Sequence, residues 1–229
     1  MACYAAIPYF CNHAMKNRIA ILGIHTGIGK TIASAVIAEA TGADYWKPVQ
    51  AGIEERDADT VRQLISNGTG RVHKEAILLS APMSPHAAAA IDNVEVDYTT
   101  FQWPQTDKVL LVETAGGILS PMSATTTMAD FVTHYQLPAI LVVQNYLGSI
   151  NHSLLSIEVL KNRDINLLGI VISGAANDAS ETFIEQYSNT RIIARIPALD
   201  KPDQASISIC AGVIRSALIK ELTLAGFKI

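Results

Sequence analysis

Short apolar runs alternate along the chain with longer segments in which apolar residues recur at helical spacing. The short runs predict β-strands, and several are apolar almost throughout, as expected for strands whose two faces are both covered. The predicted strands are residues 19–23, 45–49, 76–79, 109–113, 139–144, 168–172 and 191–196.

The longer segments predict helices between these strands, at residues 30–40, 58–66, 85–90, 126–135, 150–163, 180–187 and 205–224. Alternation of strand and helix predicts an α/β fold: a doubly wound, mostly parallel sheet with helices on both faces and right-handed crossovers. Ligands bind such sheets outside the carboxyl ends of the strands. We therefore expect the loops after residues 23, 49, 113, 144 and 172 to converge on a binding site.

The composition agrees with a globular protein and restricts its partners. Of the 229 residues, 49% are hydrophobic and 17% charged, which suits one domain with a buried core. The net charge is −4 and no basic tract occurs, so we expect no nucleic-acid partner. No apolar run reaches the ~18 residues of a membrane span. Three scattered cysteines indicate free thiols, so we expect a cytoplasmic protein with no membrane partner.

The first residues precede the first predicted strand and are mildly apolar. They lack the basic start and the long apolar core of a signal peptide. We expect a disordered extension over residues 1–17, or a natural start at Met15, followed by a single domain over residues 18–229.

The segment 23–31, Gly-Ile-His-Thr-Gly-Ile-Gly-Lys-Thr, lies between a predicted strand and a predicted helix. This layout is typical of a P-loop, in which backbone N–H groups surround phosphate oxygens at a helix N-terminus. Lys30 would reach the outer phosphates and Thr31 would hold Mg²⁺. The usual pattern has glycine where this chain has Ile24, and Gly23 comes one residue early. The alternative interpretation is a turn that only begins a helix.

Charged residues follow three other predicted strands or turns. Glu113 ends an apolar strand before a glycine-rich turn, where a carboxylate can hold Mg²⁺ bound to a nucleotide, or can simply be solvated. Lys47 ends another strand and could stabilise charge on a transferring phosphoryl group. Asp57 and Asp59 could each cap the next helix, and either could be a second Mg²⁺ ligand.

Residues 147–152 begin a helix after the predicted strand 139–144, where free backbone N–H groups suit a carboxylate or phosphate. The six histidines show no metal-ligand spacing, so no zinc site is predicted. The chain has no Gly-x-Ser-x-Gly elbow and no dinucleotide-binding Gly-x-Gly-x-x-Gly, which excludes the motifs of two large enzyme classes.

Taken together, these segments resemble the dethiobiotin synthetase family, ATP-dependent carboxylases of biotin synthesis. The resemblance runs from about residue 19 to 199, and the order of the pieces is more specific than any one of them. The residues that carry it are 23–31, 47–52, 59–60, 84–86, 113–117, 121–123, 147–152 and 196–197.

The resemblance implies a P-loop NTPase-like fold with a seven-stranded sheet, a homodimer, and 7,8-diaminononanoate, CO₂ and MgATP as substrates. In this cyclo-ligase reaction one amine captures CO₂ as a carbamate, and the γ-phosphoryl group of ATP activates the carbamate as a mixed anhydride. The second amine then closes the ureido ring and releases phosphate, leaving ADP.

The resemblance also implies roles for individual residues. The catalytic residues would be Thr26, Lys30 and Lys47, around the carbamate and the γ-phosphate. Mg²⁺ would be held by Thr31, Asp59 and Glu113, directly or through water. These three and Lys30 would bind ATP together with Gly27, Ile28, Gly29, Ile32, Thr114, Ala115, Gly116, Ser173, Pro197, Ala198 and Leu199. The diamine would contact Lys47, Ala51 and, from the partner subunit, Gly148, Ser149, Ile150 and Asn151.

The chain departs from the family pattern at several positions. Gly27 stands where members often have an acidic residue, and Ala51 replaces a hydroxyl residue. Thr114 adds bulk and a hydroxyl to the turn after Glu113. Ser173 stands where an asparagine reads adenine, with Asn177 four residues further on, so the sequence leaves the base preference open.

Three other interpretations compete with the ligase. A ParA/MinD-type switch would place a signature lysine five residues before Lys30, where this chain has His25. A cobyrinate-type synthase would add a glutaminase domain, for which the chain is too short. An inactive relative is the third, motivated by the departures at Gly27, Ala51 and Ser173.

Overall fold

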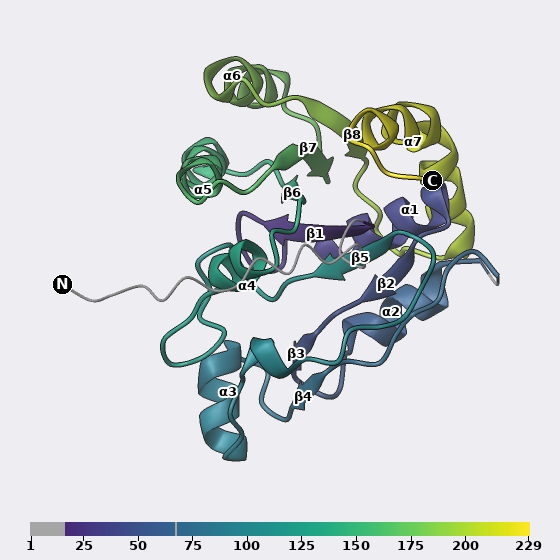
Figure 1. Ribbon diagram of the computed structural model, residues 1–229. Helices are drawn as coiled ribbons and strands as arrows, with labels where there is room; N and C mark the ends of the chain where they lie inside the picture. Colours follow the sequence, from purple (N-terminus) through teal and green to yellow (C-terminus); the bar gives the residue numbers. More distant parts are fainter. Residues whose placement is uncertain (1–16, 67) are drawn as a thin grey trace.

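The computed structural model describes residues 17–66 and 68–229, and a parallel six-stranded sheet forms its centre (Figure 1). Its strands are β1 (Arg18–Gly23), β2 (Asp44–Trp46), β5 (Leu110–Glu113), β6 (Ala139–Val143), β7 (Leu167–Ser173) and β8 (Ile192–Ile196). The order across the sheet is β2-β5-β1-β6-β7-β8, and every neighbouring pair is parallel. The predicted doubly wound α/β fold is confirmed.

The helices connect these strands and cover both faces of the sheet. They are α1 (Lys30–Thr41), α2 (Asp57–Leu64), α3 (Pro85–Asp92), α4 (Met128–His134), α5 (Ser149–Asn162), α6 (Asp178–Ser188) and α7 (Gln204–Leu224), with a 3-10 helix, η2, at Tyr98–Thr100. In Figure 1, α1, α2 and α7 lie on one side of the sheet and α4, α5 and α6 on the other. Each predicted helix is present, with ends displaced by a few residues.

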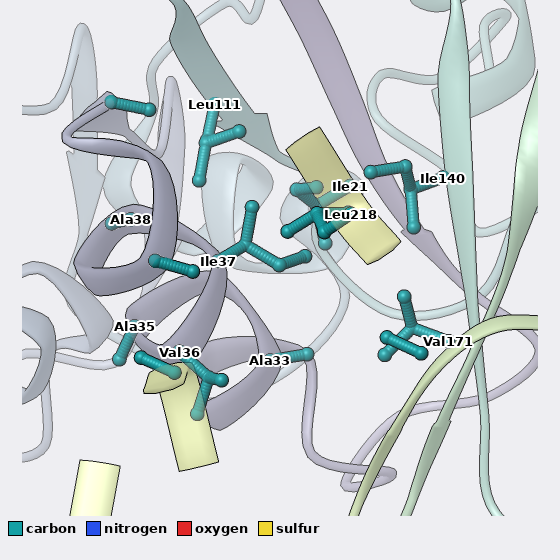
Figure 2. Close-up of a cluster of buried hydrophobic side chains, with 14 of the residues drawn as sticks. Ile21, Ala33, Ala35, Val36, Ile37, Ala38, Leu111, Ile140, Val171 and Leu218 are labelled. Carbon is teal, nitrogen blue, oxygen red and sulfur yellow. The ribbon is translucent and has the colours of Figure 1, made fainter. Parts of the chain in front are cut away.

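The alternation of side chains along β1 divides the core into two parts. Ile19 and Ile21 pack with α1 and α7, whereas Ala20 and Leu22 face the opposite layer. Figure 2 shows the first part, in which Ile21 of β1, Ile37 of α1 and Leu218 of α7 belong to one cluster. Because successive strand residues point to opposite faces, one apolar run fills both layers.

The central sheet has six strands where seven were predicted, because the predicted strand 76–79 pairs outside it with the second half of the predicted strand 45–49, which is divided. β2 ends at Trp46, and β3 (Val49–Ala51) begins after Lys47 and Pro48 and pairs with β4 (Ile77–Leu79) in a separate two-stranded sheet. Proline has no N–H to donate to a strand ladder, so a break at Pro48 is expected. The break leaves Lys47 in the gap between the two sheets.

The expected extension over residues 1–17 lies outside the described residues except for Asn17. The carbonyl of Asn17 accepts a hydrogen bond from Leu110 N–H at 2.8 Å, which ties this residue to β5. No helix of the described ranges is long and apolar enough to cross a membrane.

The winding of the chain brings the loops after β1 and β5 together. β1 is central, and it pairs with β5 on one side and β6 on the other. From β1 the chain runs through α1 to β2, beyond β5, whereas after β5 it runs through α4 to β6. The carboxyl ends of β1 and β5 therefore open to the same edge, at the place where such folds bind ligands.

Candidate active site

A pocket of about 630 Å³ lies at this edge of the sheet. It is lined by the P-loop, by the start of α2, by the turns after β3 and β5, and by the segment before α3. The lining residues are Thr26, Gly27, Gly29, Lys30, Thr31, Ile32, Lys47, Gln50, Ala51, Asp57, Pro82, Met83, Ser84, Pro85, Glu113, Ala115, Gly116 and Ser120. Loops from β1, β3 and β5 thus meet as predicted, whereas those after β6 and β7 do not line the pocket.

The geometry of the P-loop explains why its residue pattern has Gly23 and Ile24 where the usual pattern has a glycine at position 24. Gly27 and Gly29 have φ angles of 71° and 85°, in the left-handed region that favours glycine. A Cβ at Gly23 would lie 3.0 Å from the Lys30 side chain, so glycine there lets Lys30 fold back over the strand end. Ile24, at the usual glycine position, packs into the core layer opposite α1. The first glycine is therefore displaced by one residue because position 24 serves the core.

Lys30 is buried, and carbonyl oxygens hold its ammonium group. The Nζ atom donates to Gly116 O at 2.8 Å and to His25 O at 3.1 Å. Burial lowers the pKa of Lys30 to about 8, although the Glu113 carboxylate works in the opposite direction. Neutral carbonyls compensate a charge only in part, so Lys30 is suited to receive an anion such as a phosphate.

Lys47 is also buried, but it lies between two carboxylates. Its Nζ atom is 2.5 Å from Asp57 Oδ2 and 3.3 Å from Glu113 Oε1. Burial disfavours the charge on Lys47, yet the two carboxylates outweigh burial and raise its pKa. In the same way, burial raises the pKa of Asp57, but Lys47 and the Thr31 hydroxyl bring the net shift below the ordinary value. Lys47 and Asp57 therefore form a charged pair at neutral pH.

Glu113 divides its two oxygens between the core and the pocket. Oε2 accepts hydrogen bonds from Ser34 Oγ at 2.8 Å and from Tyr45 OH at 3.1 Å. Oε1 accepts from Thr31 Oγ1 at 3.1 Å and faces Lys47. Burial and the Glu113 charge raise the pKa of Tyr45, so this phenol stays a donor. The side chain is thus fixed with one oxygen toward the pocket.

Ser34 and Tyr45 are site residues that the sequence reasoning missed. Both are fully buried, and neither lines the pocket. Their positions do carry a signal: Ser34 lies one helical turn after Lys30, and Tyr45 lies two residues before Lys47. Those spacings put each of them on the same side of its element as a predicted catalytic lysine.

The structure brings Asp57, and not Asp59, to the pocket. Asp57 Oδ1 accepts a short hydrogen bond from the Thr31 hydroxyl. Asp59 instead pairs with Arg56, at 2.6 Å, and with Arg62, and its side chain is 39% exposed. Asp57 is the first residue of α2, and Asp59 follows two residues later. At about 3.6 residues per turn, the two side chains leave the helix on roughly opposite sides, so they have different surroundings.

The oxygen atoms gathered here fit a magnesium ion. Thr31 offers a hydroxyl within hydrogen-bond distance of two carboxylates, those of Asp57 and Glu113. Mg²⁺ is usually bound by one or two carboxylates together with water and substrate phosphates. Within the described ranges no group of three or more His, Cys, Asp or Glu side chains could hold a metal ion by itself.

Two predicted ATP residues point away from the pocket. The Ile28 side chain lies in the core, so only its backbone can face a phosphate. Thr114 is buried, and its hydroxyl donates to Ile21 O at 3.2 Å. The extra hydroxyl of Thr114 is therefore used within the sheet and does not obstruct the turn at Ala115 and Gly116.

The residues predicted to bind the nucleoside lie outside the pocket lining, and one of them, Ser173, lies beside the P-loop. A Cβ placed on Gly29 would come within 2.3 Å of Ser173 Oγ, so Ser173 lies directly against the loop. Pro197, Ala198 and Leu199 follow β8, next along the sheet. Asn177 caps α6: its side-chain oxygen Oδ1 accepts a hydrogen bond from Ser180 N–H at 3.0 Å. That oxygen is therefore already used within the chain.

The residues predicted to bind the carboxylate of the diamine begin α5 and do not line the pocket. Gly148 precedes this helix with φ of 100°, followed by Ser149, Ile150 and Asn151. His152 stacks on His25 of the P-loop at 6.4 Å between ring centroids. The start of α5 therefore lies near the P-loop, but residues 148–151 are not part of the pocket lining.

Comparisons with known proteins agree with these features. A family described as an AAA domain matches residues 17–206. The ATP-dependent dethiobiotin synthetase BioD of Christiangramia forsetii is 45% identical over 77% of this chain and 85% of its own. BioD of Rhodopseudomonas palustris strain BisA53 is 45% identical over 81% and 87%, and that of Brucella ovis 42% over 81% and 88%.

Solved structures with a similar fold are more distant. A ParA family ATPase from Chlorobium tepidum has a TM-score of 0.48 at 14% identity, covering 91% of this chain and 96% of its own. The MinC:MinD complex of Aquifex aeolicus contains a chain with a TM-score of 0.49 at 17% identity, with coverages of 93% and 97%. Neither likeness bears on function. On the sequence identities and coverage of the BioD relatives, the chain belongs to the ATP-dependent dethiobiotin synthetase family.

Proposed function

We propose that this protein catalyses the ATP-dependent carboxylation and ring closure of 7,8-diaminononanoate to dethiobiotin, with ADP and phosphate as the other products. The observation that carries the proposal is the pairing of two buried lysines, Lys30 and Lys47, with two carboxylates around one pocket. Phosphoryl transfer depends mainly on positioning and on charge stabilisation, which these residues provide.

Each step finds a group in the pocket. One amine of the diamine adds to CO₂ and loses a proton, which gives a carbamate. A carbamate oxygen attacks the γ-phosphorus, ADP leaves, and Lys30 and Lys47 balance the charge that moves to the leaving and attacking oxygens. Thr26 lines the same pocket, and its hydroxyl would donate a hydrogen bond to the reacting oxygens. The second amine then attacks the carbonyl carbon, and phosphate departs as the ring closes.

Thr31, Asp57 and Glu113 would hold the Mg²⁺ that accompanies ATP, with Asp57 in the place that the resemblance assigned to Asp59. When bound, the ion neutralises the β- and γ-phosphate charge. The short contacts among these three side chains support the assignment.

A homodimer would complete the site. Gly148, Ser149, Ile150 and Asn151 do not line the pocket of their own chain, and the preceding Leu147 is fully exposed. A fully exposed leucine beside free helix N–H groups suits a subunit contact that presents those groups to the carboxylate of a neighbouring site. Ser173 and residues 197–199 would border the nucleoside. The enzyme would act in the cytoplasm, where ATP is abundant.

The decisive experiment measures incorporation of ¹⁴C-bicarbonate into a ureido product with diamine and MgATP. Wild type is compared with Lys47→Ala and with Asp59→Asn, a surface change outside the pocket. We expect labelled product from wild type and Asp59→Asn, and a loss of about 10³-fold for Lys47→Ala. Absence of labelled product from folded wild type would exclude the ligase, and ATP turnover indifferent to the diamine would favour a nucleotide switch.

A further inference from the structure

Lys47 occupies the carboxylate oxygens that a metal ion would need. Its Nζ atom is 2.5 Å from Asp57 Oδ2 and 3.3 Å from Glu113 Oε1. The Thr31 hydroxyl donates to the other oxygen of Asp57 and to the same Glu113 oxygen. A cation bound by these three side chains would therefore compete with the Lys47 ammonium group for Glu113 Oε1 and for the Asp57 carboxylate.

Glu113 is fixed and cannot give way to such a cation. Ser34 and Tyr45 hold its second oxygen, and its side chain is 1% exposed. β5, which carries Glu113, is paired on both sides, with β1 and with β2. Asp57 is restrained as well, because its backbone N–H donates to Gln50 Oε1 at 3.2 Å at the start of α2.

Lys47 is the group that can move. It lies in the gap between β2 and β3, before Pro48, and its flexible side chain ends in the pocket. No hydrogen bond of its Nζ atom in the described part of the chain goes to anything other than Asp57 and Glu113. Thr26 and Lys30 line the same pocket, so a released Nζ would still be close to the place of the reacting phosphate.

We propose that the Lys47 ammonium group takes the place of the divalent cation in the nucleotide-free enzyme and is displaced from Asp57 and Glu113 when the metal binds. This inference rests on the proposed function, because it takes Thr31, Asp57 and Glu113 as the metal ligands. If the metal bound alone, Lys47 would lose the two carboxylates that balance its charge. If the metal bound with ATP, the phosphate oxygens would replace those carboxylates as partners of Lys47. The enzyme therefore loads metal and nucleotide together, and loading delivers Lys47 to the phosphate.

The test measures binding of Mn²⁺, as a probe for Mg²⁺, by electron paramagnetic resonance without nucleotide. Wild type is compared with Lys47→Met, which removes the competing ammonium, and with Lys30→Met as a matched control. Lys30 is also a buried pocket lysine, but its Nζ atom donates only to His25 O and Gly116 O among described residues. We expect Lys47→Met to bind Mn²⁺ at least about tenfold more tightly than wild type, and Lys30→Met less than about threefold, through its charge alone.

Equal or weaker Mn²⁺ binding by Lys47→Met, or an equal gain in Lys30→Met, overturns the displacement. Failure of the proposed metal site is recognised separately: Mn²⁺ with ATP would then bind wild type and Asp57→Asn equally. If Lys47→Met does not fold, the displacement is tested in the wild type by NMR of protein labelled with ¹⁵N-lysine. The Lys47 Nζ signal, assigned with Lys47→Gln, must shift when Mg²⁺ and a non-hydrolysable ATP analogue are added, and an unchanged signal contradicts the inference.

Discussion

The two ends of the ligand-binding edge are built differently. At the ends of β1 and β5, and at the gap between β2 and β3, buried charged side chains hold one another in place within a single chain. At the ends of β6, β7 and β8, the predicted ligand residues offer mostly backbone groups, and none of them lines the pocket. We call these the phosphate end and the substrate end.

The difference agrees with what each end is proposed to bind: phosphates and Mg²⁺ at the phosphate end, the nucleoside and the diamine at the substrate end. Charge on a phosphate is best stabilised by groups already in place, since reorganising them during the reaction costs energy. Buried charges are tolerated only when they are paired, so the phosphate end carries its own counter-charges. A nucleoside, or an apolar chain with a terminal carboxylate, would demand less charge, and in the proposed homodimer a second subunit would supply contacts to the diamine.

After the loss expected for Lys47→Ala, the largest effect is expected from a matched pair at the phosphate end, Asp57→Asn and Asp59→Asn. Loss of the Asp57 charge removes a proposed metal ligand and the partner of Lys47, so kcat/KM should fall by about 10²-fold or more. Asp59 only pairs with Arg56 and Arg62 at the surface, so its change should stay within about twofold. Steady-state kinetics at several Mg²⁺ concentrations measure both. A larger loss of kcat/KM for Asp59→Asn than for Asp57→Asn would identify Asp59 as the metal ligand.

The substrate end is tested by mixing two inactive variants. Lys47→Ala damages the phosphate end, and Asn151→Asp puts a negative charge at the α5 start, where the carboxylate of the diamine would bind. If each site combines the two ends from different subunits, a mixed dimer contains one intact site. Co-refolding equal amounts should then restore about a quarter of wild-type activity, since half of the dimers are mixed and each has one working site.

Activity that stays at the level of the separate variants would place both ends of a site in one chain. Size-exclusion chromatography with light scattering provides the control, since a monomer in solution would exclude the shared site. Two copies of Lys47→Ala differing only in a purification tag confirm that subunits exchange.

A smaller effect is expected from the groups that orient Glu113. Tyr45→Phe and Ser34→Ala each remove one hydrogen bond to Oε2 and leave the pocket lining intact. Groups that orient a metal ligand typically change metal affinity by about 10- to 100-fold. We expect an increase of that order in the Mg²⁺ concentration needed for half-maximal turnover. An unchanged Mg²⁺ requirement together with a lower melting temperature would show a purely structural role.

The smallest expected effect is the pH dependence of nucleotide binding without metal. The pKa of Lys30 is lowered to about 8 by burial, and its charged form favours phosphate. Raising the pH through about 8 removes that charge, so ADP affinity in EDTA should fall by about tenfold between pH 7 and pH 9. Lys30→Arg, which stays charged, should show a flat profile in the same calorimetric titration. A flat wild-type profile would contradict the shifted pKa.

The structure gathers most of the residues predicted for the phosphate end around one pocket and leaves those predicted for the substrate end outside it, for a physical reason. Lys30, Thr31 and Glu113 follow short-range rules: a glycine-rich turn between strand and helix, and a carboxylate closing an apolar strand. The choice between Asp57 and Asp59 depends on the direction in which α2 starts, and the neighbouring pattern does not reveal that direction. The orienting roles of Ser34 and Tyr45 depend on packing between β5, α1 and β2.

The sequence by itself determined the doubly wound fold, because apolar runs and helical spacing each follow from local geometry. It also determined the family, through the order of its motifs. Only the tertiary structure decided that the central sheet has six strands, that Pro48 leaves Lys47 between two sheets, and that Lys47 lies between Asp57 and Glu113. These features depend on contacts between residues far apart in the chain, whose distances and competing charges no local pattern records.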